Sequence, residues 1–565
     1  MTDRPQGLQR GLTHYGDPDF ALYLRRSFAR STGLSEAMLG RPIVGIATSP
    51  SELNNCHRTM GELVEAVRRG VLAAGALPLA FPTISLGEPF LHPTSLYLRN
   101  LMAIDVEEML RAQPLDSAVL VGGCDKTVPA QLMGAVSAEV PAVQLVVGPM
   151  LTGRFRGERL GACTDCRRFW ARFRAGELDA AEIARVEGRL AVTAGTCAVM
   201  GTASTMACLA EAMGLALPGS AAIPAVHADR LRIAEATGAL AARLALDPAA
   251  GRRTMRAILD RRVLDNALRV LLAVSGSTNA VVHLAAIAGR AGLRFDLRRL
   301  DALSEQTPVL VDLKPVGEGY MEDFFAAGGM PALLRELRPF LHLDVPTVDG
   351  RTLGEVLEEP LPEPVDRKVI RPLSEPIAPV GGLVALFGTL APEGAVLKRA
   401  AATPALLEHE GRAVVFDGLE DLARRIDDPE LEVTPADLLV LKNAGPASPA
   451  RMPEAGYLPI PQKLARAGIK DMVRISDARM SGTAFGTVVL HVAPDAASGG
   501  PLALVRTGDR IRLSVKHRRL DLLVEADELG RRREAWRPPP VPERGWARLW
   551  QEEILQAPQG CDFRF

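Results

Sequence analysis

The stretch that decides the fold is AVLVGGCDKTVPAQLMGA, residues 118–135. Its opening AVLVG (118–122) is a short apolar run of the length of a buried strand. Gly123, Cys124, Asp125 and Lys126 follow it directly. In a parallel α/β domain, ligands gather beyond the carboxyl ends of the strands. The stretch therefore predicts a buried strand that delivers a thiol, a carboxylate and an amine to a binding site.

The same alternation extends to both sides of this strand. IVGIAT (43–48), ALPLAFPT (76–83) and AVQLVVGPM (142–150) are further apolar runs of strand length. Helical spacing runs through GELVEAVRRGVLAAG (61–75), and LRNLMAIDVEEMLRA (98–112) is a second helix. Strands that alternate with helices are typical of an α/β fold with a largely parallel sheet.

The composition changes near residue 360. LEEPLPEPVDRKVIRPLSEPIAPVGG (357–382) is rich in proline and charge, which is typical of a linker. We therefore expect an N-terminal α/β domain over 1–360, a linker over 361–382 and a second domain over 383–565.

The C-terminal region contains mostly runs of strand length, which predicts a β-rich, barrel-like or sandwich domain. We expect the two ends of the chain to be arms on a neighbouring subunit or to lie in solvent. The expected strands are VALFGTLA (384–391), RAVVFDG (412–418), DLLVLKN (437–443), DMVRISD (471–477), TVVLHVAP (487–494), LALVRTGD (502–509) and the pair RIRLSVKHRRLDLLV (510–524).

Composition excludes several classes of partner. The 66 Lys and Arg residues nearly balance the 67 Asp and Glu residues, and only 4% of residues are aromatic. The chain therefore lacks the excess of basic and aromatic residues that is typical of a nucleic-acid-binding surface. No uninterrupted apolar stretch reaches the length of a membrane span. The first twenty residues lack the apolar core of a secretory signal. We expect a cytoplasmic protein that acts on a small molecule.

Seven scattered cysteines argue against a disulfide framework. Cys56, Cys124 and Cys197 lie where strands pass into loops, so their thiolates could converge on an iron–sulfur cluster. Such clusters usually take four cysteines, and three would leave one iron position free for a substrate oxygen. The spacing alone leaves buried free thiols as the alternative.

Carboxylates beside these cysteines suggest a second metal. Asp125 and Glu88 offer the hard oxygen ligands that Mg²⁺ takes. A buried Lys126 could react with carbon dioxide to give a carbamate, which is an anionic oxygen ligand. The alternatives are an ion pair at a turn for Asp125 and Lys126, and a helix N-terminal acid for Glu88.

Seven ordered segments carry a resemblance to a known family. They run from about residue 10 to about residue 530 and resemble the dihydroxy-acid and phosphogluconate dehydratases. The segments are SELNNCHR (51–58), GGCDKTVPAQLMGA (122–135), TAGTCAVMGTASTMACLAEAMGLALPGSAAIPAV (193–226), SGSTNAVVHL (275–284), GYMEDFFAAGGMPALLREL (319–337), MPEAGYLPIP (452–461) and SDARMSGTAFGT (476–487).

The resemblance implies roles for particular residues and a homodimer or homotetramer. It implies a [2Fe–2S] cluster, with [4Fe–4S] as the alternative, together with Mg²⁺. The implied mechanism is removal of the C2 proton, loss of the C3 hydroxyl and tautomerisation to a 2-keto acid. The implied residues are Cys56, Cys124 and Cys197 on the cluster, Glu88, Asp125 and carbamylated Lys126 on Mg²⁺, Glu454 on or beside Mg²⁺, Ser481 as the base, and Thr483 on the substrate.

Three stretches of the sequence narrow the range of expected substrates. SLGEPF (85–90), LKNAGP (441–446) and MSGTAFGT (480–487) resemble the sugar-acid branch, such as the arabinonate and xylonate dehydratases. The expected reaction therefore converts an aldonic acid into a 2-keto-3-deoxy acid. The alternative is a dihydroxy-acid dehydratase of branched-chain amino-acid biosynthesis. PASPARMPE (446–454) departs from the expected glycine-rich approach to Glu454, which leaves a changed substrate range or impaired activity open.

A CxxC pair, Cys163 and Cys166, stands apart from these motifs. We expect incidental thiols in a loop that begins at Gly157, and we expect Cys163→Ser to spare both the cluster and turnover. The alternative is a redox or cluster-supporting role for the pair. Rival interpretations of the whole protein are a thiol-redox protein that uses this pair, and a non-enzymatic electron-transfer or sensing protein that uses the cluster. The sequence assigns no role to SGST (275–278) or His283.

Overall fold

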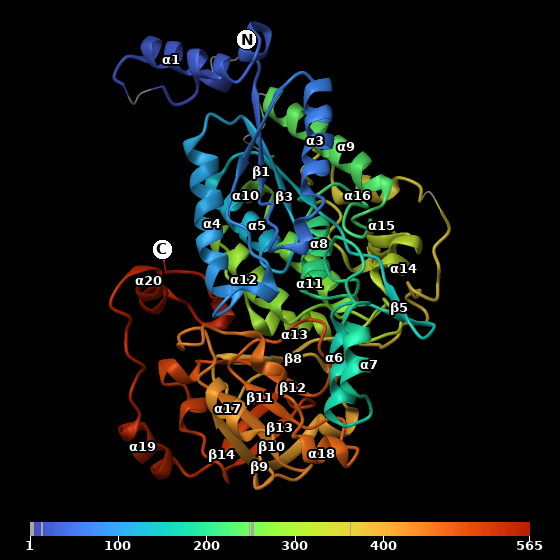
Figure 1. Cartoon of the computed structure of the whole chain (residues 1–565), viewed down its shortest axis with the longest axis vertical. Coiled ribbons are helices and arrows are strands. Elements are labelled where there is room, and N and C mark those ends of the chain that lie inside the picture. The colour runs from blue at the N-terminus through green and yellow to red at the C-terminus, as the bar shows by residue number, and fades with distance from the viewer. Residues whose placement is uncertain (1–4, 13–14, 248, 250–252, 362, 565) are drawn as a thin grey trace.

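The computed structural model describes residues 5–12, 15–247, 249, 253–361 and 363–564. Its N-terminal part is built on a four-stranded sheet in the order β2 (Leu77–Pro82), β1 (Ile43–Thr48), β3 (Ser117–Gly122) and β4 (Ala142–Val146). All neighbouring strands are parallel. Every residue of β1, β3 and β4 is buried, as expected for a parallel sheet covered on both faces. Figure 1 shows this sheet in the upper half of the molecule.

Helices cover both faces of this sheet. α3 (Met60–Ala73) and α9 (Ala228–Leu246) pack on one face, and α5 (Thr127–Ala138) with α4 (Ser95–Ala112) covers the other. α3 and α9 approach closely because two glycines lack side chains. A Cβ on Gly70 would lie 1.9 Å from the carbonyl oxygen of Glu235, and one on Gly238 would lie 2.2 Å from that of Val67.

Buried helices continue from this sheet toward the C-terminal part. α8 (Thr202–Ala212) and α12 (Asn279–Arg290) are buried along nearly their whole length and lie near the centre of the molecule (Figure 1). Other helices surround them: α11 (Arg261–Ala273), α13 (Leu297–Ser304), α14 (Met321–Ala326), α15 (Gly329–Glu336) and α16 (Leu353–Glu358).

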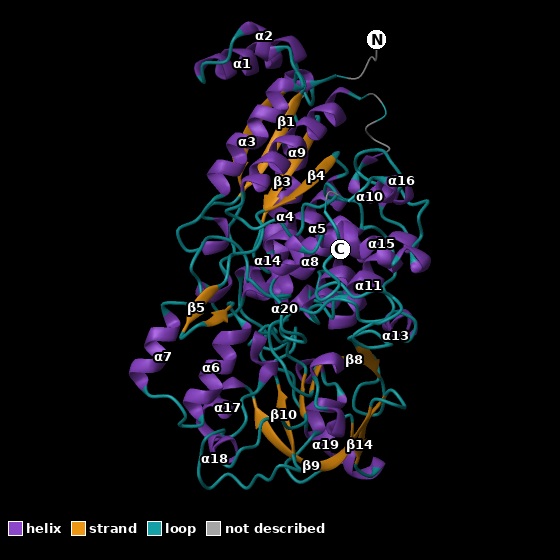
Figure 2. Cartoon of the chain, turned by 90° about the vertical axis from the view of Figure 1, so that its right-hand side faces the viewer, coloured by secondary structure: helices purple, strands orange, loops and turns teal. Residues whose placement is uncertain are grey.

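The C-terminal part is an eight-stranded, nearly closed sheet, which Figure 2 shows in the lower half of the molecule. Its closure comes from Phe387, whose amide donates to the carbonyl of Arg518 and whose carbonyl accepts from the amide of Leu520. The predicted fold class, a parallel α/β region followed by a β-rich barrel, is confirmed. The strand order is β14 (Arg519–Leu523), β13 (Arg510–Ser514), β9 (Glu408–Asp417), β10 (Leu438–Lys442), β11 (Arg474–Ser476), β12 (Val488–Ala493), β8 (Gly394–Leu397) and β7 (Val384–Leu386).

Two predicted elements differ from the structure. The strand expected over 502–509 is instead a 3-10 helix, Pro501–Leu504, followed by a turn. Its apolar residues are buried, so periodicity over so short a run did not separate strand from helix. The loop expected from Gly157 contains β6 (Glu158–Leu160), which pairs with β5 (Gly153–Phe155), and then helix α6 (Thr164–Arg174).

The segment predicted as a linker, 361–382, has neither helix nor strand among its described residues. It is tied to the N-terminal part by isolated bridges from Val311 to Ile370 and from Val309 to Ala378. The domain boundaries at 360 and 382 stay a prediction.

The C-terminal end packs against the rest of the protein. The predicted alternative in which this end lies in solvent is therefore wrong. α20 (Gly545–Glu553) returns to the N-terminal part, where Trp550 is fully buried beside Leu96 and Val282. Arg99 is also buried and donates to the carbonyls of Gly560 and Cys561 at 2.8 and 2.7 Å. Among the described helices, none combines the length and the apolar character that a membrane span requires.

Candidate active site

The site lies where the order of the parallel strands reverses. From β1 the sheet runs to β2 on one side and to β3 and β4 on the other. The loops after β1 and β3 flank the crevice that such a reversal creates, which is where open α/β sheets bind ligands. Cys56 lies in the 3-10 turn after β1, and Cys124 directly follows the end of β3.

The Cys124 turn is strained and held in place. Cys124 has a φ of 66°, in the left-handed region that costs a non-glycine residue about 1–2 kcal/mol. A Cβ on Gly123 would lie 2.1 Å from Cγ2 of Val147, so this glycine permits close packing inside the protein. His57, which sequence reasoning missed, accepts a hydrogen bond from the Gly123 amide at its Nε2 (3.1 Å).

Four thiols gather at this edge of the sheet. The interaction of the Cys56 thiol with Cys124, together with burial, raises the pKa of Cys56. The Sγ of Cys163 lies 3.4 Å from the Sγ of Cys197, and this contact, with burial, raises the pKa of Cys197. Thiols assembled in this way can bind a soft metal centre. The pair expected in one loop is divided, because Cys163 lies in the turn before α6 and Cys166 lies in the first turn of that helix.

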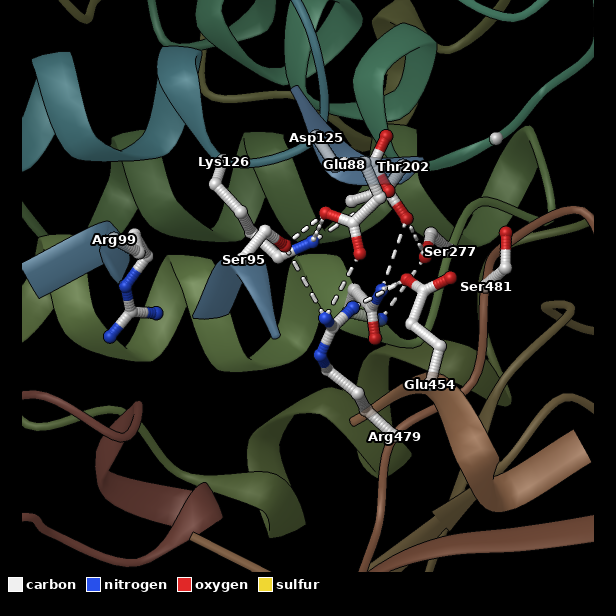
Figure 3. Close-up of polar contacts among 12 residues, drawn as sticks. Glu88, Ser95, Arg99, Asp125, Lys126, Thr202, Ser277, Glu454, Arg479 and Ser481 are labelled. Atoms are coloured by element: carbon white, nitrogen blue, oxygen red, sulfur yellow. Dashed lines mark hydrogen bonds and ion pairs between the residues drawn. The ribbon is translucent and has the colours of Figure 1, made fainter. Parts of the chain in front are cut away.

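Three carboxylates form a second group beside the thiols. Glu88 begins a 3-10 turn after β2, Asp125 precedes α5, and Glu454 begins a 3-10 turn between β10 and β11. One oxygen from each lies within 4.8 Å of the others, and among the described residues this is the one such group of three. Figure 3 shows these carboxylates gathered near the guanidinium of Arg479. An all-oxygen set of this kind suits a hard divalent cation.

The environment separates the pKa values of these carboxyl groups. Burial opposes ionisation of Glu88, but the charges of Lys126 and Arg479 outweigh it and lower the pKa of Glu88 to about 2. Burial, with repulsion from Glu88 and Glu454, raises the pKa of Asp125 to about 7 despite the attraction of Lys126. A cation bound between them would favour the ionised form of both.

Lys126 lies beside these carboxylates, as the sequence suggested. Its side chain is 1% exposed, and its Nζ lies 3.3 Å from Oε2 of Glu88 and 3.7 Å from Oδ2 of Asp125. As an ammonium it offsets part of the negative charge of the three carboxylates. Conversion to a carbamate would replace this positive charge with a negative one, so the carbamate fits here only together with a bound cation.

Arg479 is the main residue that sequence reasoning missed. Its guanidinium is buried and forms ion pairs with Glu88 (3.2 Å) and Glu454, and it donates to Oγ1 of Thr94 at 2.7 Å. Arg479 therefore fixes the carboxylates of two distant segments in one arrangement. Its position two residues before Ser481 was the available signal, but an arginine in a loop is usually exposed.

Ser481 and Thr483 lie together in the loop between β11 and β12. Ser481 is 7% exposed, and its Oγ lies 2.8 Å from Oγ1 of Thr483. The Nε of Arg167 donates to the same Thr483 oxygen at 3.4 Å. A buried Lys398 supports the loop from behind, because its Nζ donates to the carbonyl of Gly482 at 3.3 Å.

The loop before Glu454 is strained where glycines were expected. Arg451 and Met452 both have a φ of 55°. Arg479 holds this turn through a hydrogen bond from its Nε to the Met452 carbonyl at 2.9 Å. Trp550 holds it from the other side, where the indole Nε1 donates to the carbonyl of Pro446 at 2.9 Å. The unusual sequence therefore still delivers Glu454 to the carboxylate group.

The SGST segment and His283 support the site from α12. Asn279 donates to Oε1 of Glu454 (3.0 Å) and to Oγ1 of Thr202 (3.2 Å), which lies 2.8 Å from Oγ of Ser277. Burial lowers the pKa of His283, whose Nδ1 accepts from Arg99 at 3.1 Å. A neutral His283 thus orients Arg99.

Comparison with known proteins identifies the family. The N-terminal region of the dihydroxy-acid/6-phosphogluconate dehydratases matches residues 41–356, and their C-terminal region matches residues 368–561. The chain belongs to this dehydratase family. It is therefore a hydro-lyase, as its sequence motifs predicted.

Relatives from two branches of the family match nearly the whole chain. An L-arabonate dehydratase of Azospirillum brasilense is 45% identical over 98% of this chain and 96% of its own. A 6-deoxy-6-sulfo-D-gluconate dehydratase of Pseudomonas putida is 44% identical over 94% of this chain and 91% of its own. A dihydroxy-acid dehydratase of Carboxydothermus hydrogenoformans is 39% identical over 95% and 97%. The predicted resemblance to the sugar-acid branch is confirmed.

Proposed function

We propose that this dehydratase removes water from an aldonic acid to give a 2-keto-3-deoxy acid. The observation that carries the proposal is the group of three carboxylates, Glu88, Asp125 and Glu454, in which Asp125 directly follows Cys124 in the chain. Hard oxygen ligands beside soft sulfur ligands suit two different metals in one pocket. The similarity to enzymes named for sugar acids favours an aldonate over a branched dihydroxy acid.

We assign two ligand sets on the basis of the family resemblance. Cys56, Cys124 and Cys197 would hold a [2Fe–2S] cluster, and Glu88 and Asp125 would hold Mg²⁺ with a carbamylated Lys126. Glu454 completes this group or orients it through Asn279. When bound, the two metal centres supply Lewis acids for the departing C3 hydroxyl and for the substrate carboxylate and C2 hydroxyl.

The residues of the chain then position the substrate and move the proton. Ser481 accepts the C2 proton at its Oγ, which is buried away from bulk water. The neighbouring Thr483 hydroxyl and the charge of Arg167 behind it favour the ionised form of Ser481. Arg479 holds Glu88 and Glu454 in place through its ion pairs with both carboxylates, which preorganises the site.

A panel of acids tests the proposed reaction. Protein purified without oxygen and supplied with Mg²⁺ should form a 2-keto acid from L-arabinonate, D-xylonate or 6-deoxy-6-sulfo-D-gluconate, measured by hydrazone formation. 2,3-Dihydroxyisovalerate is the matched substrate of the other branch. A faster reaction with this branched acid than with every aldonate would contradict the proposal.

The same preparation tests the ligand assignments. Cys56→Ser, Cys124→Ser or Cys197→Ser should remove both the visible absorption of the cluster and turnover. Lys126→Arg should keep the positive charge but abolish Mg²⁺ binding, because arginine cannot form the carbamate. Light scattering tests the predicted homodimer or homotetramer.

A further inference from the structure

The proposed function leaves one thiol at the site without a role. Cys163 caps the N-terminal end of α6, and its segment is held on two sides. The amide of Ala198 donates to the carbonyl of Ala162 at 3.0 Å, and the hydroxyl of Thr164 donates to the carbonyl of Thr483 at 3.0 Å. These bonds hold Cys163 between the segment of the cluster cysteine Cys197 and the loop of the base Ser481.

The four thiols of the site form two pairs. Cys163 lies 3.4 Å from Cys197, sulfur to sulfur, and Cys124 lies close enough to Cys56 to raise the pKa of its thiol. Two sulfurs on one tetrahedral metal lie about 3.7 Å apart when each metal–sulfur bond is about 2.3 Å long. A four-cysteine [2Fe–2S] cluster needs two such pairs, one for each iron.

We infer that Cys163 is a fourth thiolate ligand of the cluster, bound beside Cys197 at the position that three cysteines would leave open. The inference rests on the proposed function, since it requires that Cys56, Cys124 and Cys197 hold the cluster. Cys163 would bind the iron in the absence of substrate and would leave it when a substrate hydroxyl binds at the same position. This exchange replaces one electron-pair donor with another, so it needs neither oxidant nor reductant.

The position of Cys166 separates this role from that of a redox pair. Cys166 donates from its Sγ to the carbonyl of Cys163 at 2.6 Å and lines a cavity of about 870 Å³ with Arg167 and Tyr457. If Cys163 and Cys166 acted as a dithiol, replacing either one would have the same effect. If Cys163 is a ligand, only its own replacement changes the iron.

Mössbauer spectroscopy of substrate-free protein tests the inference. Wild type, Cys163→Ala and the matched control Cys166→Ala are loaded with ⁵⁷Fe and sulfide without oxygen. We expect two similar iron sites in wild type and in Cys166→Ala, and two distinct sites in Cys163→Ala, where one iron loses a sulfur ligand. The same spectrum in wild type and Cys163→Ala would overturn the inference.

A second measurement needs only wild-type protein, and it decides the matter if Cys163→Ala fails to fold. Cysteines are alkylated with iodoacetamide before and after the cluster is removed with a chelator, and the modified peptides are measured by mass spectrometry. Cys163 should be protected by the cluster together with Cys56, Cys124 and Cys197. Equal alkylation of Cys163 before and after would overturn the inference, whereas wild type that takes up no iron and sulfide would contradict the proposed function itself.

Discussion

At the scale of single residues, the site depends on charges that no single segment of the chain contains. Arg479 and Lys126 hold Glu88 ionised, while burial pushes the neighbouring Asp125 toward its neutral form. These four groups come from three separate loops. Each would behave differently alone, because a pKa responds to burial and to charges within a few ångströms.

The first prediction concerns Ser481 as the base. Ser481→Ala should lower kcat by about 10²–10⁴, the usual contribution of a positioned acid or base. Mg²⁺ and iron content should stay unchanged, because the hydroxyl contacts Thr483 rather than a carboxylate of the group. Steady-state kinetics and metal analysis measure both effects. Ser498→Ala, at an exposed position, is the control, and a kcat within twofold of wild type in Ser481→Ala would rule out this role.

The second prediction concerns pH. Burial lowers the pKa of Lys398 from its ordinary 10.5 to about 7. Between these values the unfolded chain binds a proton that the folded protein does not, so this residue makes the protein more stable as pH rises from 7 to 10.5. In this window the free energy of unfolding should rise by about 1.4 kcal/mol per pH unit because of Lys398.

Lys398→Met should lack this contribution. Its free energy of unfolding relative to wild type should therefore be most favourable near pH 7 and should decline toward pH 9.5, as urea midpoints at several pH values would show. Lys470→Met removes an exposed lysine and should leave the curve unchanged. Parallel curves for wild type and Lys398→Met would mean that Lys398 does not titrate in this window.

At the scale of secondary-structure elements, α6 is anchored by one buried carboxylate. Asp165 is 0% exposed and accepts from the Gly161 amide (2.8 Å), the Tyr320 hydroxyl (2.9 Å) and Lys314 (3.2 Å). These bonds fix the start of the helix against the segment before α14. The placement of Cys163 depends on this anchor, because Cys163 directly precedes the helix.

The third prediction follows from this anchor. Asp165→Ala should reduce the free energy of unfolding by about 3–5 kcal/mol, because it removes a fully buried carboxylate and leaves the largely buried Lys314 without its ion-pair partner. Glu158→Ala is the matched control. It removes a partner of the neighbouring Arg168 at the surface and should cost at most about 1 kcal/mol. Urea unfolding compares the two variants, and equal losses would contradict the anchoring role.

At the scale of the whole molecule, the C-terminal end joins the two parts of the structure. Trp550 packs against Leu96 and Val282 of the N-terminal part and bonds the carbonyl of Pro446 in the loop that carries Glu454. A residue near the end of the chain therefore supports a loop of the active site more than ninety positions earlier.

The fourth prediction tests this connection. Trp550→Ala should cost about 3–5 kcal/mol of stability, as for other buried tryptophans, and should weaken Mg²⁺ binding because the Glu454 loop loses its support. Trp550→Phe keeps most of the packing and loses only the indole hydrogen bond, which is worth about 1 kcal/mol. Thermal unfolding and Mg²⁺ titration measure both effects. Unchanged Mg²⁺ affinity in Trp550→Ala would contradict the proposal that Trp550 supports the Glu454 loop.

Much of the fold could be predicted because strand and helix patterns are local. The run AVLVG is β3, and GCDK (123–126) lies at its carboxyl end as expected. Local patterns failed at LALV (502–505), where four apolar residues suit a strand and a buried turn equally well. They also failed at 158–174, where a strand of only three residues is followed by a helix rich in arginine.

The sequence by itself determined the fold class, the family and the residues at the ends of the strands. The local hydrophobic pattern and the motifs can be interpreted without knowledge of contacts between residues that are distant in the chain. Only the tertiary structure decided that Arg479 binds Glu88 and Glu454, that Cys163 lies against Cys197, and that Trp550 supports the Glu454 loop. These contacts join residues far apart in the chain, and their partners are set by the packing of two sheets on a shared core of helices.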